Sequence, residues 1–163
     1  MVKGALFQLT RRLQVLIQRK QTNVTALGWR PSFIAISSTS MTRLAPFDLL
    51  RWISHYYGFG TFIHYIKGFL DNNTYEESKQ KLDQLIKQSK ASNAGIYVDT
   101  IISPSFRTAV AQIIQIPGIS GMDNNSVLFE FDYDEKDNLA DIIDGCHFAA
   151  LVDYNICVLR SSK

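Results

Sequence analysis

The stretch IPGISGMDNNSVLFEF, residues 116–131, has the spacing in this sequence that comes nearest to a phosphate-binding loop. Gly118 and Gly121 stand three residues apart, and a polar step and an alternating apolar run follow them. Glycine loops bind phosphate when the backbone N–H groups at the start of the next helix point at the ligand.

The order of the neighbouring elements argues against that chemistry. The loop follows a predicted helix, 105–116, and precedes a predicted strand, 126–132, so it lies at the amino edge of a sheet. The spacing also departs from G-x-G-x-x-G and from the P-loop, because no Lys-Ser or Lys-Thr follows. We therefore interpret the loop as a turn, in which Asn125 ties the chain to the start of the strand through its side-chain amide.

Three histidines are the candidates for acid–base or metal chemistry: His55, His64 and His147. No two of them share a metal-ligand spacing, and no G-x-S-x-G nucleophile elbow is present. We expect each to be a structural histidine, and we expect no enzyme activity, no catalytic residue and no metal site.

Four acids form the densest charge cluster: Asp132, Asp134, Glu135 and Asp137. Clustered oxygen ligands suit calcium, but the glycine and terminal glutamate of an EF-hand loop are missing. The favoured interpretation is a solvated loop whose last acid, Asp137, caps the next helix.

A run of hydroxyls follows the first predicted strand and consists of Ser37, Ser38, Thr39 and Ser40. In open α/β sheets, ligands bind outside the carboxyl ends of the strands, where hydroxyls can hold phosphate or ribose. This run is the candidate nucleotide site, and an ordinary polar loop is the alternative.

Strands and helices alternate along most of the chain. The charge is nearly balanced, with 17 basic and 15 acidic residues, so nothing points to nucleic acid as a partner. Short β-branched runs alternate with helical stretches of ten or more residues, which indicates βαβ units. The predicted fold is a three-layer, Rossmann-like α/β domain over 28–163 with a mostly parallel five-stranded sheet. Its predicted strands are 31–37, 60–66, 94–102, 126–132 and 156–160.

A separate amphipathic helix precedes this domain, and a polar linker ends the 1–27 segment. Within residues 5–20 a leucine seam follows heptad spacing and consists of Leu6, Leu9, Leu13 and Leu16. The helix could pack on its own domain or on a second copy.

No apolar run in the sequence is long enough to span a bilayer. The two cysteines, Cys146 and Cys157, are typical of packed, reduced thiols.

Three motifs resemble the cytoplasmic C-terminal domain of the cation–chloride cotransporters. The glycine loop is similar to that family's Gly-Leu-Gly-x-(Leu/Met)-x-x-Asn-Thr-Val stretch, with Gly118, Gly121 and Asn125 at matching positions and Ser120 in place of a glycine. Trp29, Arg30 and Pro31 match the family's Trp-Arg-Pro before the first strand. GALFQLTRRLQVL resembles the helix that connects the membrane part to the soluble part.

The resemblance implies a universal-stress-protein-like fold and a regulatory role without catalysis. It implies a homodimer whose connecting helices cross, joined to the transmembrane domain of a transporter that moves chloride with sodium or potassium. The location would be the cytoplasmic face of a membrane, where Arg11, Arg12, Arg19 and Lys20 could meet anionic lipid. The alternative is a nucleotide-sensing module of the universal stress type; its phosphate motif would require glycine at Phe131.

Overall fold

The computed structural model describes residues 2–20, 29–40, 42–56, 58–116, 118, 123–132 and 138–161, with the side chains of the first helix described over 4–16. It confirms the predicted α/β class, because a five-stranded sheet lies between helices and one helix precedes the first strand. The elements are α1 (Val2–Lys20), β1 (Ser32–Ser37), α2 (Ala45–Tyr56), β2 (Phe59–Lys67), α3 (Asn72–Ala91), β3 (Tyr97–Ser103), α4 (Phe106–Ile113), β4 (Ser126–Asp132), α5 (Leu139–Leu151) and β5 (Asn155–Ser161).

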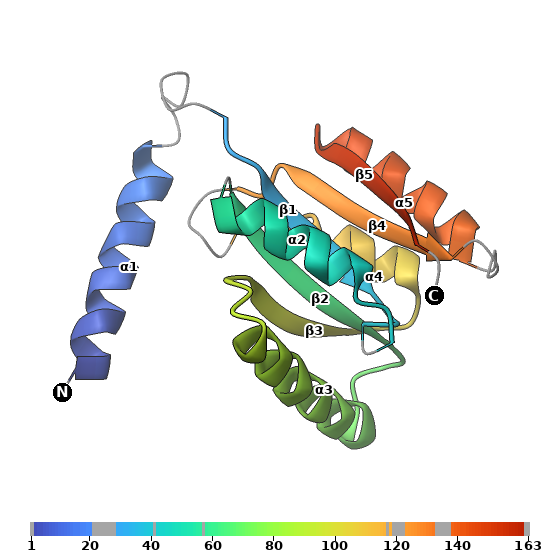
Figure 1. The fold of residues 1–163 in the computed structure, drawn as a ribbon, viewed down its shortest axis with the longest axis horizontal. Helices are drawn as coiled ribbons and strands as arrows, with labels where there is room; N and C mark the ends of the chain where they lie inside the picture. The colour runs from blue at the N-terminus through green and yellow to red at the C-terminus, as the bar shows by residue number, and fades with distance from the viewer. Residues whose placement is uncertain are drawn as a thin grey trace.

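All five strands are parallel, in the order β3-β2-β1-β4-β5 (Figure 1). The chain builds outward from β1 to β3 and then crosses over to β4 on the other side. The carboxyl ends of β1 and β4 therefore flank the point at which the strand order reverses.

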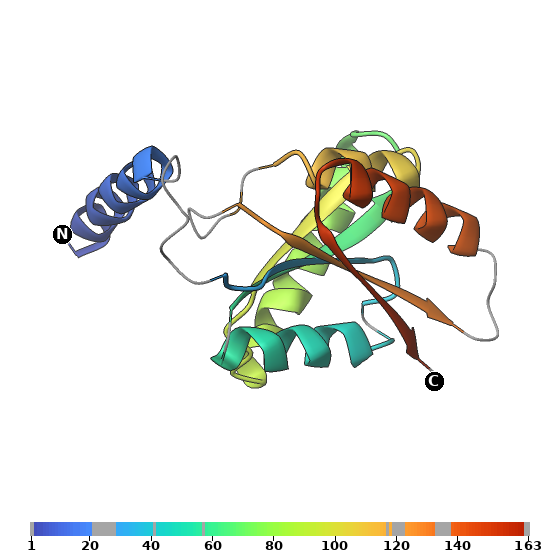
Figure 2. The same cartoon turned by 90° about the horizontal axis from the view of Figure 1, so that it is seen from above.

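Helices α2 and α3 cover one face of the sheet, and α4 and α5 cover the other (Figure 2). Phe47 and Leu50 of α2 and Leu85 of α3 pack with Phe62 and Leu128 on one face. On the opposite face a second core contains the buried side chains of α4 and α5, including Val110, Ile113, Ile142 and Ala149. Because side chains alternate between the faces of a strand, each of the three inner strands, β2, β1 and β4, contributes to both cores.

A polar side chain caps the start of α3, whereas α5 has no side-chain cap. Asp71 caps α3, since its carboxylate accepts from the Thr74 backbone N–H at 2.9 Å and the Thr74 hydroxyl accepts from Asp71 N–H at 3.0 Å. At α5 the expected cap was wrong by one residue, because the capping position falls on Asn138, which makes no side-chain capping bond. Asp137 itself lies outside the described residues.

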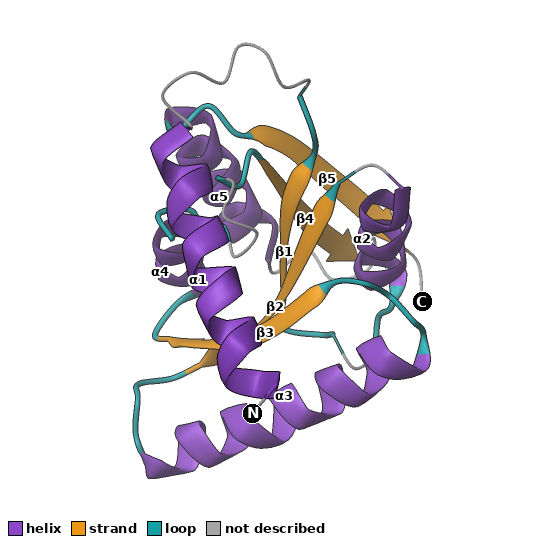
Figure 3. Cartoon of the chain, turned by 90° about the vertical axis from the view of Figure 1, so that its left-hand side faces the viewer, coloured by secondary structure: helices purple, strands orange, loops and turns teal. Residues whose placement is uncertain are grey.

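Helix α1 stands apart from the α/β body (Figure 1; Figure 3, viewed from the side on which α1 lies). Every residue from Gly4 to Leu16 is exposed. The four seam leucines are 50–57% exposed: Leu6 57%, Leu9 56%, Leu13 50% and Leu16 53%. No helix within the described ranges is long and apolar enough to cross a membrane.

Candidate functional site

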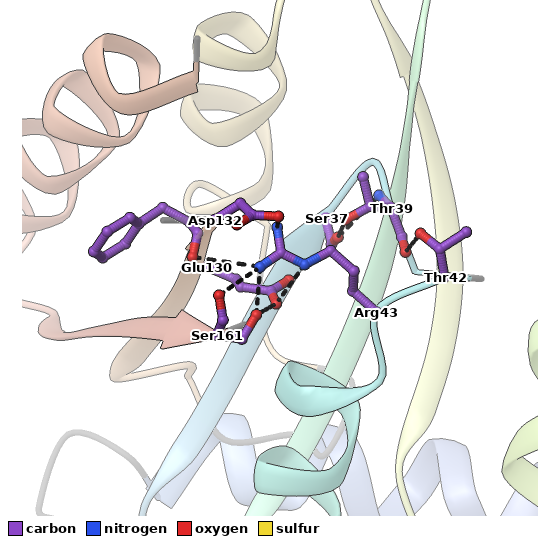
Figure 4. A network of polar contacts seen from close by, with 8 residues as sticks. Ser37, Thr39, Thr42, Arg43, Glu130, Asp132 and Ser161 are labelled. Carbon is purple, nitrogen blue, oxygen red and sulfur yellow. Dashed lines mark hydrogen bonds and ion pairs between the residues drawn. The ribbon is translucent and has the colours of Figure 1, made fainter. Parts of the chain in front are cut away.

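The carboxyl edge of the sheet, where a doubly wound fold would bind a ligand, is filled by the side chain of Arg43 (Figure 4). Arg43 lies in the loop between β1 and α2, and its guanidinium reaches across to the ends of β4 and β5. Its Nε lies 3.2 Å from Glu130 Oε1, and its Nη1 lies 3.4 Å from Asp132 Oδ2. Its Nη2 donates to the Ser161 carbonyl at 3.1 Å and also contacts the Ser161 hydroxyl.

This cluster is almost entirely removed from water. The side chain of Arg43 is 9% exposed, and those of Glu130 and Asp132 are 3% and 4% exposed. The Ser161 hydroxyl also donates to Glu130, so the ends of three segments share one network. Two carboxylates face one guanidinium, so the net charge at this edge of the sheet is negative. A negatively charged site repels phosphate and would bind it poorly.

The predicted hydroxyl site lies beside this cluster, and its groups bind one another. The Ser37 and Thr39 hydroxyls are 3.2 Å apart, and the Thr39 backbone N–H donates to Ser37 Oγ at 3.1 Å. The Thr39 carbonyl accepts from the backbone N–H groups of Thr42 and Arg43 at 2.9 and 3.0 Å. Ser38 is exposed. The run therefore shapes the turn that carries Arg43 into the crevice.

Ser40 joins this loop to β2 through a buried pair. Its hydroxyl lies 2.6 Å from His64 Nδ1, and the two residues are 1% and 5% exposed. Burial, with a smaller contribution from the charge of Lys81, lowers the pKa of His64 from 6.5 to about 4. His64 is therefore neutral at physiological pH, and the buried Ser40 hydroxyl has no access to a substrate. His55 and His147 are both exposed.

The depressed pKa of His64 predicts a pH-dependent stability. Between pH 6.5 and about 4 the unfolded chain binds a proton at His64 that the native chain does not, so the free energy of unfolding falls as the pH falls. We expect this residue to account for a loss of about 3 kcal/mol between pH 7 and pH 4. Urea unfolding at pH 7 and pH 4 would measure it: His64→Gln should remove this part of the loss, and the exposed-site control His55→Gln should retain it. Equal pH dependence in both variants would contradict the assignment.

At the opposite, amino edge of the sheet, Asn125 joins the strand starts. Its amide oxygen accepts from the Ser32 backbone N–H at 3.0 Å and from the Ser126 hydroxyl at 2.8 Å, and its amide nitrogen donates to the Arg30 carbonyl at 2.7 Å. Asn125 thus ties β4 to the start of β1, 93 residues away. The sequence analysis predicted that the Asn125 amide would bind at the start of a strand. It did not predict that the start of β1 would be bound as well.

The Trp-Arg-Pro residues lie next to this tie. Trp29 is 69% exposed, Arg30 is exposed, and Pro31 is half-buried against Gly58. Two of the family-like motifs therefore meet in space, because Asn125 from one binds the Arg30 carbonyl in the other. Gly118 is half-buried, and Gly121 lies outside the described residues.

A hollow of about 410 Å³ also lies at the amino edge. Asp123, Asp153 and the residues that follow the carboxyl ends of α4 and α5 line it, so it is negative in character. No group of three metal-ligating side chains occurs in the part of the chain that the structure describes. Asp134 and Glu135 lie outside that part, and Asp132 pairs with Arg43.

Arg43 is the residue of this candidate site that the sequence analysis did not single out. The loop that carries it offers its side chain no acidic partner, and the groups that its guanidinium contacts lie 87 to 118 residues further along the chain. Two sequence features could have indicated this network: a single arginine in the loop after the first strand, and two acids spaced i, i+2 at the end of β4.

Comparison with known proteins adds no assignment. No protein-family model matches this chain, and no curated protein matches it.

Proposed function

We propose that this chain is a regulatory and dimerisation domain, without catalytic activity, from a membrane transporter similar to the cation–chloride cotransporters. The observation that carries the proposal is the uncovered leucine seam of α1, whose four leucines are at least half exposed. Burying one leucine side chain contributes about 1.5–3 kcal/mol, so two such seams would associate strongly. Heptad spacing suits a helical partner of the same kind.

The coupling in this proposal is mechanical. The α/β body has its own two cores, and α1 contributes to neither. The linker reaches the body at residues 29–31, where Asn125 and Gly58 hold the chain. The orientation of the body would then pass through this junction to α1 and on to the membrane helices of the parent. Arg11 and Arg12 are exposed on α1 and would contribute about 1 kcal/mol each at an anionic lipid surface.

The seam is tested by Leu9→Glu combined with Leu13→Glu. We expect the mass of the unaltered chain to rise with concentration through the α1 contact and the double variant to lose this association step. The dissociation constant of the α1 contact should rise at least about a hundredfold, because two carboxylates from each chain would be buried in it. Light scattering over a concentration series measures this. Gln8→Glu with Thr10→Glu is the matched control, since it adds the same two charges beside the seam.

Two outcomes would contradict the proposal. One is an unchanged mass in the seam variant, and the other is a chain starting at Gly28 that associates through the same contact as the full chain. The shorter chain is a fair test because every described side chain of α1 is exposed and none belongs to the cores. The nucleotide-sensor alternative stays a prediction, and direct titration with ATP or ADP separates it from this proposal.

A further inference from the structure

The outer edge of the sheet at β5 has the composition of an inner strand. Residues 156–159 are four consecutive apolar residues, of which Ile156 is 40% and Val158 45% exposed. The pairing of β5 with β4 runs without a bulge from Asn155 to Ser161. Neither proline nor a charged residue interrupts this apolar run, although natural edge strands usually carry such protection, and the charged residue of the strand, Arg160, follows the run.

The other edge of the sheet is different. β3 carries Asp99 within the strand, and α3 packs over β3. A charged residue within the strand and a covering helix are both common ways of blocking further strand addition. Among the residues that the structure describes, β5 is thus the edge open to continuation of the sheet.

Helix α5 extends this apolar edge into a second layer. Asp144 and Phe148 face α4, where both contact Arg107, and Ile142, Gly145 and Ala149 are buried toward the sheet. The side of α5 that points away from α4, above the free edge of β5, carries a stripe at helical spacing. Its members are Leu139, Ile143, Cys146 and Ala150, of which three are exposed and Cys146 is half-buried.

We infer that the β5 edge and the α5 stripe together bind a second copy of this chain about a two-fold axis. An antiparallel β5–β5 pair would continue the sheet, and the same rotation brings the two α5 stripes together in the layer above. A single peptide strand could pair with the backbone N–H and C=O groups of the β5 edge, but it would leave the α5 stripe exposed to water. A second copy covers both layers because it presents both.

The charges at the two ends of β5 favour the antiparallel arrangement. Asp153 lies two residues before the strand, and Arg160 lies near its end. Antiparallel pairing brings the arginine end of one strand to the aspartate end of the other, whereas parallel pairing would bring like charges together. This contact involves none of the α1 residues, so it stands or falls independently of the proposed function.

The decisive substitution is Val158→Lys, made in the full-length Leu9→Glu/Leu13→Glu chain so that α1 no longer contributes. We expect that parent chain still to dimerise, and Val158→Lys to raise its dissociation constant at least about a hundredfold by burying an unpaired ammonium group. Tyr97→Lys is the matched control, because Tyr97 is 40% exposed on the opposite edge strand and its replacement should leave the dissociation constant unchanged. Sedimentation equilibrium measures all three chains, and circular dichroism verifies that each is folded.

Cys157 provides a second, positive readout. It lies in the middle of β5, so antiparallel pairing about the centre of the strand brings the two Cys157 side chains within reach of a short bismaleimide. We expect a cross-linked dimer with Cys146→Ser and none with Cys157→Ser. A monomeric Leu9→Glu/Leu13→Glu chain, a mass that Val158→Lys does not change, or the absence of a Cys157 cross-link would each overturn the inference.

Discussion

Replacing Arg43 with methionine is expected to lower the free energy of unfolding by about 3–5 kcal/mol. The substitution keeps much of the side-chain volume but leaves Glu130 and Asp132 buried beside each other without their cation. It also removes the donors to the Ser161 carbonyl and hydroxyl, which tie β5 to the loop after β1. Urea unfolding at pH 7 measures the loss.

The matched control is Arg51→Met. Arg51 pairs with Asp48 at 3.4 Å, but its side chain is 43% and that of Asp48 56% exposed, so we expect a change within about 0.5 kcal/mol. A rescue separates charge from packing: adding Glu130→Gln and Asp132→Asn to Arg43→Met should recover much of the lost stability. An Arg43→Met chain as stable as the Arg51→Met control would show that the network contributes little.

Replacing Gly58 with alanine is expected to cost about 3 kcal/mol, the upper part of the range for overpacking. A Cβ at this position would lie 1.8 Å from the Pro31 carbonyl oxygen and 2.9 Å from the Pro31 carbonyl carbon, both backbone atoms. The chain cannot give way freely there, because the same oxygen accepts from the Phe59 backbone N–H at 3.0 Å. Thermal or urea unfolding would record the loss.

Gly4→Ala is the control for this substitution. A Cβ at Gly4 meets nothing within 4 Å, so the stability of the α/β body should not change. The Gly58 variant also bears on the coupling mechanism, since it displaces the chain where the linker from α1 reaches the body. An unchanged unfolding midpoint for Gly58→Ala would mean that the junction at 29–31 moves easily and could not pass on an orientation.

The alternation of elements could be predicted because it depends on local patterns. The β-branched runs, the amphipathic helices and the polar turns each favour one conformation over a few residues, and their order implies a parallel sheet. The heptad spacing of the α1 leucines predicted an apolar seam in the same way, and those leucines are exposed in the structure. The role of Asn125 could be anticipated in part, because asparagine side chains commonly bind backbone groups in turns.

Local patterns along the chain therefore suffice to predict its helices and strands, their fold class and the apolar seam of α1. The tertiary structure alone decided which distant groups meet. Arg43 meets Glu130, Asp132 and Ser161 only because β4 crosses over to lie beside β1 and β5 follows on its outer side. The same strand order leaves an apolar strand at an edge, and the loop geometry brings Ser40 to His64. Local sequence patterns do not predict these pairings. The free energy that selects them comes from apolar burial and charge interactions between segments that are remote in sequence.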